Sequence, residues 1–184
     1  GPARFSFMPD PLPNLLAPNA PTPVRWTVND LRADAQPAGT RLFARVGLIG
    51  PFLEITPTAD GDGWAAALPG AACGAVVQFY LSVPLAGGGQ AFHPPQGPAR
   101  PYQARTGTGS TPCAPCRADV SRDGFATGED FDLFIEAFFT ARRDALGVLI
   151  ADLATAGSGA TTPDTFPTGA DFALFVQSFF TGCP

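Results

Sequence analysis

A duplicated segment in the last third of the chain constrains the fold most. Residues 128–140 (GEDFDLFIEAFFT) match residues 169–181 (GADFALFVQSFFT) at eight of 13 positions, with an offset of 41 residues. Large apolar side chains recur at helical spacing in each copy. We interpret the pair as a duplicated loop–helix unit, so this part of the chain should form a small helical module.

The residues before the first copy carry oxygen atoms at a regular spacing. Positions 1, 3, 5, 9 and 12 of this loop have oxygen-bearing side chains, position 6 is Gly124, and position 7 would offer its backbone carbonyl. This is the pattern of an EF-hand loop, in which alternate groups turn inward onto a calcium ion that takes six to eight oxygens. The predicted ligands are Asp119, Ser121, Asp123, Phe125, Thr127 and Asp130. An ordinary Asp/Gly turn before an N-capped helix is the alternative.

The loop before the second copy departs from this pattern, because an insert rich in small residues interrupts it. Its candidate ligands are Asp152, Asp164, Phe166, Thr168 and Asp171. A second calcium site and a metal-free loop that only supports the helix both remain open.

The first two thirds of the chain alternate between apolar and polar residues. Val24, Trp26 and Val28 point one way and their neighbours the other, which is the period of a half-buried strand. Val77, Phe79 and Leu81 likewise alternate with polar neighbours. About seven such runs, separated by Gly- and Pro-rich turns, predict an antiparallel β-sandwich. The runs are residues 24–31, 41–47, 52–58, 63–68, 76–83, 90–93 and 99–106.

These patterns divide the chain into four parts. Residues 1–21 form a Pro-rich leading segment with little regular structure, and residues 22–106 form the sandwich. Residues 107–115 are small, polar and breaker-rich, and we expect a linker there. Residues 116–184 form the duplicated loop–helix module.

Composition excludes some classes of function. The net charge is −5 with 11 basic residues, all of them Arg, and no basic stripe exists, so we expect no nucleic-acid partner. No run of apolar residues is long enough to span a membrane. The first residues, Gly1-Pro2, resemble the remnant of a cleaved tag, so we expect a piece of a longer precursor.

The module resembles a dockerin, with Cys116-Arg-Ala-Asp119 at its start and Thr181-Gly182-Cys183 at its end. It is most similar to planctomycete-type repeats that end in Gly-Cys, and the upstream region more loosely resembles Ig-like or fibronectin-like accessory domains. The resemblance implies a mostly β plus α fold, an Ig-like antiparallel β-sandwich followed by a small EF-hand-like (dockerin) helical module. It also implies Ca²⁺ binding and docking to a cohesin-like or cell-surface scaffold protein.

In dockerins the partner contacts lie at loop positions 10 and 11 and along the helices. The corresponding residues differ from the Ser-Thr pair of cellulosomal dockerins. Large side chains that leave the helical core stripe would add to the docking surface, although packing within the module is the alternative. The candidates are Gly128, Glu129, Leu133, Phe139, Gly169, Ala170, Leu174 and Phe180, whereas Phe131, Phe134, Ile135, Phe138 and their counterparts Phe172, Phe175, Val176 and Phe179 should be core.

Four cysteines and no second CxxC favour disulfides over a zinc or redox site, and hence a secreted, extracellular or cell-surface protein. We expect Cys116–Cys183 to join the ends of the module and Cys73–Cys113 to tie the linker to the sandwich. Exchange of Cys113 and Cys116 is the competing pairing.

We expect no enzyme. The single histidine, His93, precedes two prolines, and we expect it in a solvated loop. Tryptophans on alternating strands, such as Trp26 and Trp64, are more often core residues than part of a sugar-binding platform. A carbohydrate-binding module that binds a polysaccharide is nevertheless one alternative function. A C-terminal sorting or anchoring region of a secreted enzyme is another.

Overall fold

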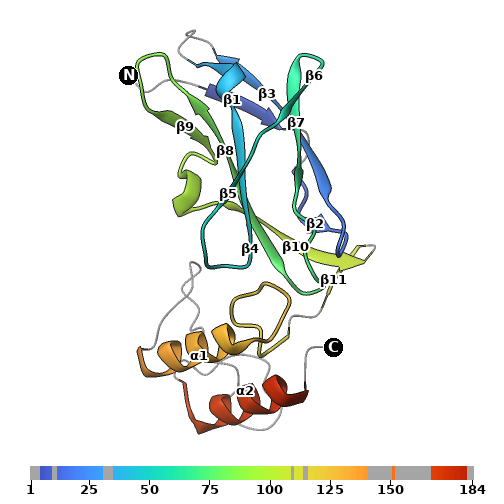
Figure 1. Cartoon of the computed structure of the whole chain (residues 1–184), viewed down its shortest axis with the longest axis vertical. Coiled ribbons are helices and arrows are strands. Elements are labelled where there is room, and N and C mark those ends of the chain that lie inside the picture. The colour runs from blue at the N-terminus through green and yellow to red at the C-terminus, as the bar shows by residue number, and fades with distance from the viewer. Residues whose placement is uncertain are drawn as a thin grey trace. The chain divides into compact units, whose positions relative to one another are not determined.

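The computed structural model describes residues 5–9, 12–30, 35–108, 110–113, 116–140, 151 and 167–181. The chain divides into two compact units, residues 1–113 and residues 114–184 (Figure 1). The first is built from β-strands and the second contains two helices, so the predicted combination of β and α structure is confirmed. Neither described helix is long and apolar enough to cross a membrane.

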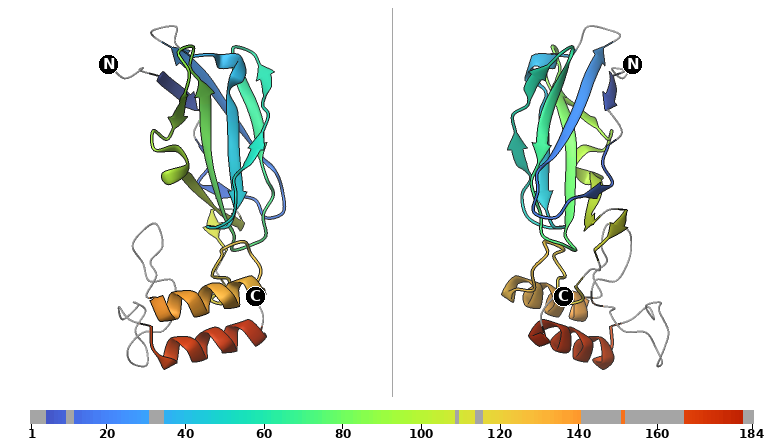
Figure 2. Two further views of the ribbon diagram at one scale, coloured as in Figure 1. Left: turned by 60° about the vertical axis from the view of Figure 1, so that its left-hand side comes forward. Right: turned by 90° about the vertical axis from the view of Figure 1, so that its right-hand side faces the viewer.

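Two β-sheets form the first unit, and Figure 2 shows them as two layers. One sheet has the order β1-β3-β7-β6, and the other has the order β11-β10-β8-β4-β5, with β9 on β8 and β2 on β10. The strands are β1 (Phe5–Pro9), β2 (Leu15–Leu16), β3 (Thr22–Asp30), β4 (Arg41–Val46), β5 (Leu53–Ile55), β6 (Thr58–Asp60), β7 (Gly63–Leu68), β8 (Val76–Pro84), β9 (Gln90–His93), β10 (Tyr102–Thr108) and β11 (Thr111–Pro112). Short 3₁₀ turns lie at η1 (Pro37–Gly39) and η2 (Gly97–Ala99).

Apolar residues from both sheets share one core. On β3 the alternation predicted from the sequence places Val24 and Trp26 inside, as expected. Leu68 of the same sheet meets Leu42 and Phe79 of the other sheet in this core. The period-two pattern therefore selects the inner face of each sheet, and burial of these side chains stabilises the unit.

Strand β8 differs from the half-buried strand that the sequence predicts, because both of its faces are buried. Gln78, Tyr80 and Ser82 alternate with the core residues, yet all three have less than a tenth of their surface exposed. Phe43 stacks on the Tyr80 ring at 4.9 Å, and Phe52 and Phe92 meet the same ring edge-on. These aromatic side chains cover the outer face of the sheet. The cover also desolvates Tyr80, which raises the pKa of its hydroxyl.

Both ends of the first unit contain more strand than the sequence predicts. The leading segment, expected to have little regular structure, contributes β1 and β2. The expected linker, residues 107–115, contains the end of β10 and β11, which pair with each other. Small polar and Pro-rich residues are poor strand formers, but pairing with a preformed neighbour overrides this preference.

Cys73 and Cys113 form a disulfide, the pairing preferred from the sequence. Cys116 is also disulfide-bonded, which excludes a free Cys113/Cys116 redox pair. Its expected partner, Cys183, lies outside the described residues.

The second unit contains α1 (Gly128–Thr140) and α2 (Gly169–Thr181), which coincide with the two copies of the repeat. Each helix begins after a threonine whose backbone N–H and hydroxyl both donate to the aspartate three residues later. The pairs are Thr127 with Asp130 and Thr168 with Asp171. This N-terminal cap satisfies donors that a helix start leaves unpaired.

Aromatic contacts between the helices are reciprocal. Phe134 stacks on its counterpart Phe175 with ring centroids 4.1 Å apart. The flanking contacts repeat with the helices exchanged, as expected for an antiparallel pair with approximate twofold symmetry. Phe131 contacts Phe175 and Phe179, and Phe172 contacts Phe134 and Phe138. The duplication in the sequence thus produces a nearly symmetric helix pair.

The contribution of a buried series of hydrogen bonds to the stability of the first unit can be tested. The Trp26 Nε1–H donates to Thr40 Oγ1 at 3.2 Å, and that hydroxyl donates to the Ser82 carbonyl at 3.1 Å, joining β3 to β8. Replacing Thr40 by valine should lower the free energy of unfolding by about 1–3 kcal/mol, because it leaves buried polar groups unsatisfied. Chemical denaturation of Thr40→Val would measure this. Thr40→Ser keeps the hydroxyl and should recover most of the loss; equal losses in both variants would contradict the assignment.

Candidate metal centre

The loop before α1 is folded around the carboxylate of Asp119. Its Oδ1 accepts hydrogen bonds from the Asp123 backbone N–H at 3.0 Å and from the Ser121 hydroxyl at 3.3 Å. Its Oδ2 accepts the Gly124 N–H at 2.9 Å. Gly124 has a φ of +99°, which permits the turn that brings its N–H back to Asp119. Asp119 therefore lies in the interior of the loop, with only 1% of its surface exposed.

Asp130 connects this loop to the start of α1. Its Oδ2 accepts the Thr127 N–H at 2.8 Å, and its Oδ1 accepts the Ser121 N–H at 2.8 Å. Asp130 is fully buried, although it is an acidic residue. One carboxylate thus holds both the first half of the loop and the first turn of the helix.

Asp119, Asp123 and Asp130 bring their carboxylates together, with one oxygen of each within 4.8 Å of the others. All the groups gathered there are oxygens, which suits a hard cation such as calcium or magnesium better than zinc or copper. Among the described residues, no arginine forms an ion pair with these carboxylates. Within the part of the chain that the structure describes, the site therefore gathers negative charge without an ion-paired cationic side chain.

The electrostatics of Asp119 reflect this arrangement. Burial raises the pKa of the Asp119 carboxyl, and the neighbouring charges of Asp123 and Asp130 raise it further. The hydrogen bonds from the Gly124 and Asp123 N–H groups act in the opposite direction. A bound cation would favour the ionised form and offset the cost of burying these charges.

The other predicted ligands of the first loop take mixed positions. Ser121 is buried, and its hydroxyl points to Asp119. Phe125, expected to offer its carbonyl, donates its N–H to Asp123 Oδ1 at 2.9 Å. The Thr127 hydroxyl donates to Asp130 as part of the helix cap. The structure therefore brings three predicted carboxylates and one hydroxyl together and uses Thr127 to begin the helix.

Only part of the second loop belongs to the described residues. Thr168 and Asp171 repeat the cap seen at Thr127 and Asp130, and Asp171 is fully buried. Asp152, Asp164 and Phe166 lie outside the described residues. The second copy thus shares the helix start of the first.

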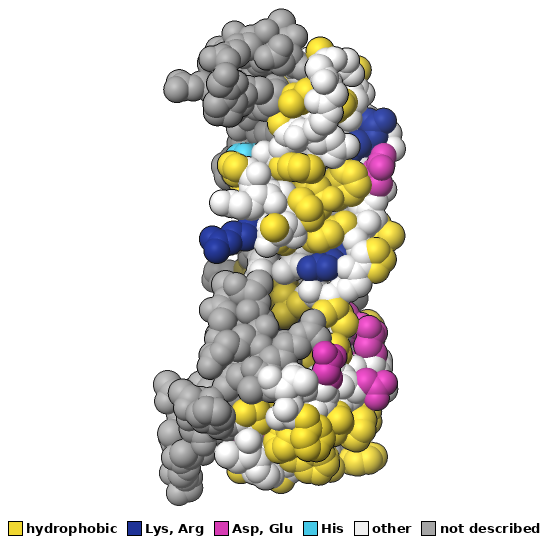
Figure 3. Space-filling view, turned by 90° about the vertical axis from the view of Figure 1, so that its left-hand side faces the viewer, with side chains coloured by type: hydrophobic (Ala, Val, Ile, Leu, Met, Phe, Trp, Pro, Cys, Tyr) yellow, Lys and Arg dark blue, Asp and Glu magenta, His cyan; other side chains and the backbone are white. Residues whose placement is uncertain are grey.

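The predicted partner-binding residues lie on the helices with different exposures. Phe139 and Phe180 occupy the same place in the two copies and are 80% and 81% exposed. Gly128, Glu129, Gly169 and Ala170 are also exposed, whereas Leu133 and Leu174 are half-buried. Figure 3 shows hydrophobic side chains gathered on this unit beside acidic ones.

Two residues assigned to the core of the helix pair are more exposed than predicted. Phe131 and its counterpart Phe172 are 38% and 40% exposed, although each contacts rings of the other helix. A two-helix core is too narrow to enclose every ring of an apolar stripe. Phe125 is 59% exposed and was not among the predicted contact residues. Its exposure could have been inferred from its place at loop position 7, because only the backbone carbonyl of that position turns toward the ion.

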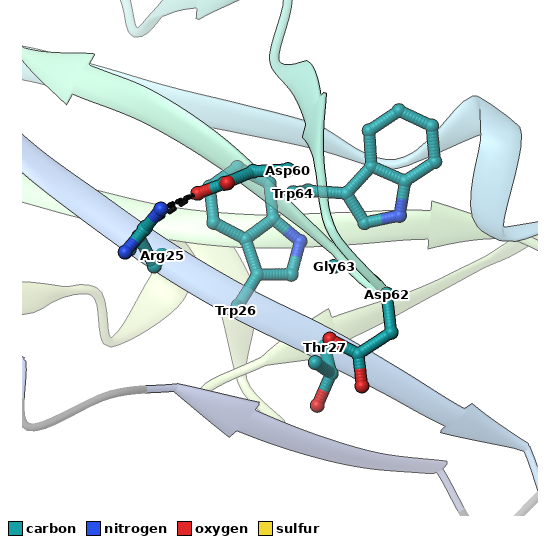
Figure 4. A pocket seen from close by; sticks show the side chains of 7 residues that line it. All are labelled: Arg25, Trp26, Thr27, Asp60, Asp62, Gly63 and Trp64. Carbon is teal, nitrogen blue, oxygen red and sulfur yellow. Dashed lines mark hydrogen bonds and ion pairs between the residues drawn. The ribbon is translucent and has the colours of Figure 1, made fainter.

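The first unit offers little support for a tryptophan sugar platform. Trp26 is in the core, and Trp64 is half-buried against it. Beside them lies a shallow depression of about 220 Å³, also lined by Arg25, Thr27 and Asp60. Figure 4 shows the Arg25–Asp60 ion pair there, which already uses both charges.

His93 is half-buried within the predicted strand run 90–93, and not in the solvated loop that was expected for it. It is the last residue of β9, and its Nε2 lies 2.7 Å from the Tyr102 hydroxyl. Burial lowers the pKa of its imidazole. A tyrosine neighbour supplies neither the nucleophile nor the acid of a Ser/His/Asp arrangement.

The double role of Asp130 yields a test that needs no metal. Asp130→Ala, studied with a chelator present, should destabilise the second unit by about 0.5–2 kcal/mol because the Thr127 cap is lost. Helical circular dichroism during thermal unfolding would measure the loss. Asp132→Ala changes an exposed acid on the same helix and should have little effect. Equal melting of the two variants would contradict the capping role.

No protein-family model matches this chain, and no curated protein matches it.

Proposed function

We propose that this chain is a non-catalytic, calcium-dependent protein–protein attachment module of a secreted protein. In this proposal the first unit is an Ig-like β-sandwich, and the second is an EF-hand-like, dockerin-like helical module. Calcium stabilises the loop before α1, and the helix pair docks onto a cohesin-like or cell-surface partner.

The observation that carries the proposal is the meeting of Asp119, Asp123 and Asp130 in one loop. Their carboxylates lie at loop positions 1, 5 and 12, with Gly124 at the turn, which is the order that an EF-hand loop requires. Ser121 adds a buried hydroxyl between them. An acid cluster of this composition favours calcium over a transition metal, because it offers neither imidazole nor thiolate.

Calcium would act by folding linkage. The three carboxylates repel one another when no cation is bound, and their burial adds to the cost. An ion that binds only the folded loop stabilises that state, by about 2.7 kcal/mol at a calcium concentration 100 times the dissociation constant. Because Asp130 also caps α1, the same event stabilises the start of the docking helix.

The docking surface would be formed by exposed phenylalanines of the helix pair. Phe139 and Phe180 are each about four fifths exposed, and Phe131 and Phe172 expose about two fifths of their surface. Large exposed aromatic rings are costly in water and frequent in protein interfaces. Four of them, repeated in the two copies, favour a protein partner over a purely structural role.

Charge distinguishes the two helices within this surface. Glu129 and Asp132 are exposed on α1, whereas their counterparts on α2 are Ala170 and Ala173. The partner we propose is therefore a protein with an apolar surface that carries Lys or Arg on the side facing α1. Acidic residues on one helix only would select a single orientation of the partner, despite the symmetry of the phenylalanines.

Secretion is proposed from the cysteines. The Cys73–Cys113 disulfide, and the disulfide at Cys116, are typical of proteins in oxidising compartments.

The calcium site is tested by isothermal titration calorimetry of the chelator-stripped protein. The wild type should bind with a dissociation constant below about 1 mM. Asp123→Asn should weaken binding strongly, because it removes a charge while its amide oxygen can still accept the Phe125 N–H. Asp119→Ala should abolish binding. Asp132→Asn removes an exposed acid outside the cluster and should bind normally. A folded wild type without calcium-dependent heat or melting shift would overturn the proposal.

The docking surface is tested by the pair Phe139→Ser and Phe180→Ser. Because both rings are largely exposed, the double variant should change the free energy of unfolding by no more than about 0.5 kcal/mol. The wild type should retain cell-surface proteins when calcium is present and release them when a chelator is added. The double variant should lose this retention. Leu53→Ser, at an exposed residue of the first unit, is the matched control. Unchanged retention by the double variant would argue against this surface.

A further inference from the structure

The sheet that contains β4, β8 and β10 carries an apolar surface on its outer side. Phe43 and Phe52 pack on the buried Tyr80 ring, and Phe92 meets that ring edge-on from β9. The three phenylalanines are half-buried, so part of each remains in contact with solvent. We call this surface, formed by Phe43, Phe52, Tyr80 and Phe92, the aromatic sheet face. An antiparallel sheet commonly turns one face to the core and a polar face to water, so an apolar outer face marks a contact surface.

Arginines border the aromatic sheet face on two strands. Residues two apart in a strand point to the same side, so Arg41 and Arg45 flank Phe43 on β4. Arg105 of β10 lies opposite Val76, an outward-facing residue of β8, and therefore faces the same side. Figure 3 shows hydrophobic side chains of the first unit gathered among arginines.

The two units also differ in the sign of their charge. Residues 1–113 contain seven arginines and six acidic residues, whereas residues 114–184 contain four arginines and ten acidic residues. Glu54, which forms an ion pair with Arg41, is the only acidic residue on the described strands of this sheet. The aromatic sheet face is therefore complementary to a surface that is both apolar and acidic.

The helix pair of the second unit offers such a surface. Its exposed phenylalanines include Phe139 and Phe180. Exposed acidic residues follow α1 at Glu129, Asp132 and Glu136, on the same helix as Phe139. Packing of helices on a sheet face is one of the few layer arrangements that bury apolar surface in proteins. The outer surface of the helix pair therefore matches the aromatic sheet face in apolar character and is opposite to it in charge.

We infer that the helix pair of one copy docks onto the aromatic sheet face of a second copy, with the acidic residues of α1 toward the bordering arginines. This inference rests on the docking surface of the proposed function and names a second copy of this chain as one of its partners. Because the two surfaces lie on different units, a docked copy keeps one surface free for the next copy, and the copies add head to tail. A copy attached at the cell surface through its helix pair thus recruits further copies through its aromatic sheet face.

Sedimentation equilibrium of the full chain tests whether copies associate. The average mass should rise between chain concentrations of about 10 μM and 1 mM, the range of weak interfaces. It should fall again in about 1 M salt, which screens the charges of the two surfaces. A monomer at every concentration, the behaviour of a chain whose helix pair binds its own sheet, would overturn the inference.

Charge substitutions on β10 test the sheet side of the contact. Gln103→Glu combined with Arg105→Gln changes two exposed residues and should weaken association at least about tenfold, because acidic surfaces then meet. The matched control is Thr58→Glu combined with Ala59→Glu, which makes the same change of net charge at exposed residues of the other sheet. Equal weakening by both double variants would show a general charge effect and contradict the assigned face.

A mixture of two impaired variants tests the pairing of unlike surfaces. The β10 double variant retains an intact helix pair, and Phe139→Ser combined with Phe180→Ser retains an intact aromatic sheet face. Neither should associate alone, but an equal mixture should form a heterodimer with an affinity close to that of the wild type. Failure of the mixture to form a complex would overturn the inference, because like surfaces would then be in contact.

The same experiments separate this inference from the attachment function. A chain that retains cell-surface proteins in calcium but stays monomeric by itself would overturn the inference and leave the attachment function standing. Association that persists in chelator, restored in the mixture and without retention of any surface protein, would support the inference and contradict the attachment function.

Discussion

A carboxylate buried in protein must be matched by hydrogen-bond donors or by a cation, and the second unit is organised around this requirement. Asp119 and Asp130 are almost fully buried, and between them they collect N–H groups from the loop and from the helix start. These bonds give the loop its shape without a metal. Among the described residues no arginine pairs with these carboxylates, and this is why we propose calcium as the complement of their charge.

The helix pair of the second unit is nearly symmetric. Two copies of one segment meet through Phe134 and Phe175, and the flanking rings exchange roles between the helices. Near-identical helices that pack on each other present near-identical outer faces, so Phe139 and Phe180 are exposed together. Their acidic neighbours are not duplicated, which gives the pair a direction. Symmetry in the apolar residues and asymmetry in charge thus have separate consequences for the partner that we propose.

In the first unit, side chains cover the inner faces of both sheets and the outer face of β8. Its inner faces meet in a common core, while the outer face of β8 is covered by Phe43, Phe52 and Phe92. Arg45 adds to this cover, with its guanidinium 4.4 Å from the centre of the Phe52 ring. Burial lowers the pKa of Arg45, which still donates to Gln78. The Cys73–Cys113 disulfide then joins the segment before β8 to the residue that follows β11, where the chain leaves the unit.

Local patterns in the sequence were sufficient for several of these features. The period-two runs of β3 and β8 identified inward-facing residues such as Trp26 and Phe79, because a strand must place alternate side chains on one face. The repeat predicted both helices, and the loop spacing predicted that Asp119, Asp123 and Asp130 would meet. Each of these rests on residues close together in the chain, whose geometry is set by backbone periodicity.

Contacts between distant residues decided the rest. The sequence offered no sign that Tyr80 and Gln78 would be covered, because the side chains that cover them come from other strands. Phe131 and Phe172 matched the core stripe, but a pair of helices has too little depth to bury every ring of that stripe. The parallel register of β2 on β10 likewise depends on where the sheet leaves an open edge, which no local pattern encodes. The sequence by itself determined the strands with alternating side chains, the helices and the acidic loop. Only the tertiary structure decided that β1, β2 and β11 form at all, because they depend on pairing with a neighbouring strand, and which faces of the sheets are covered.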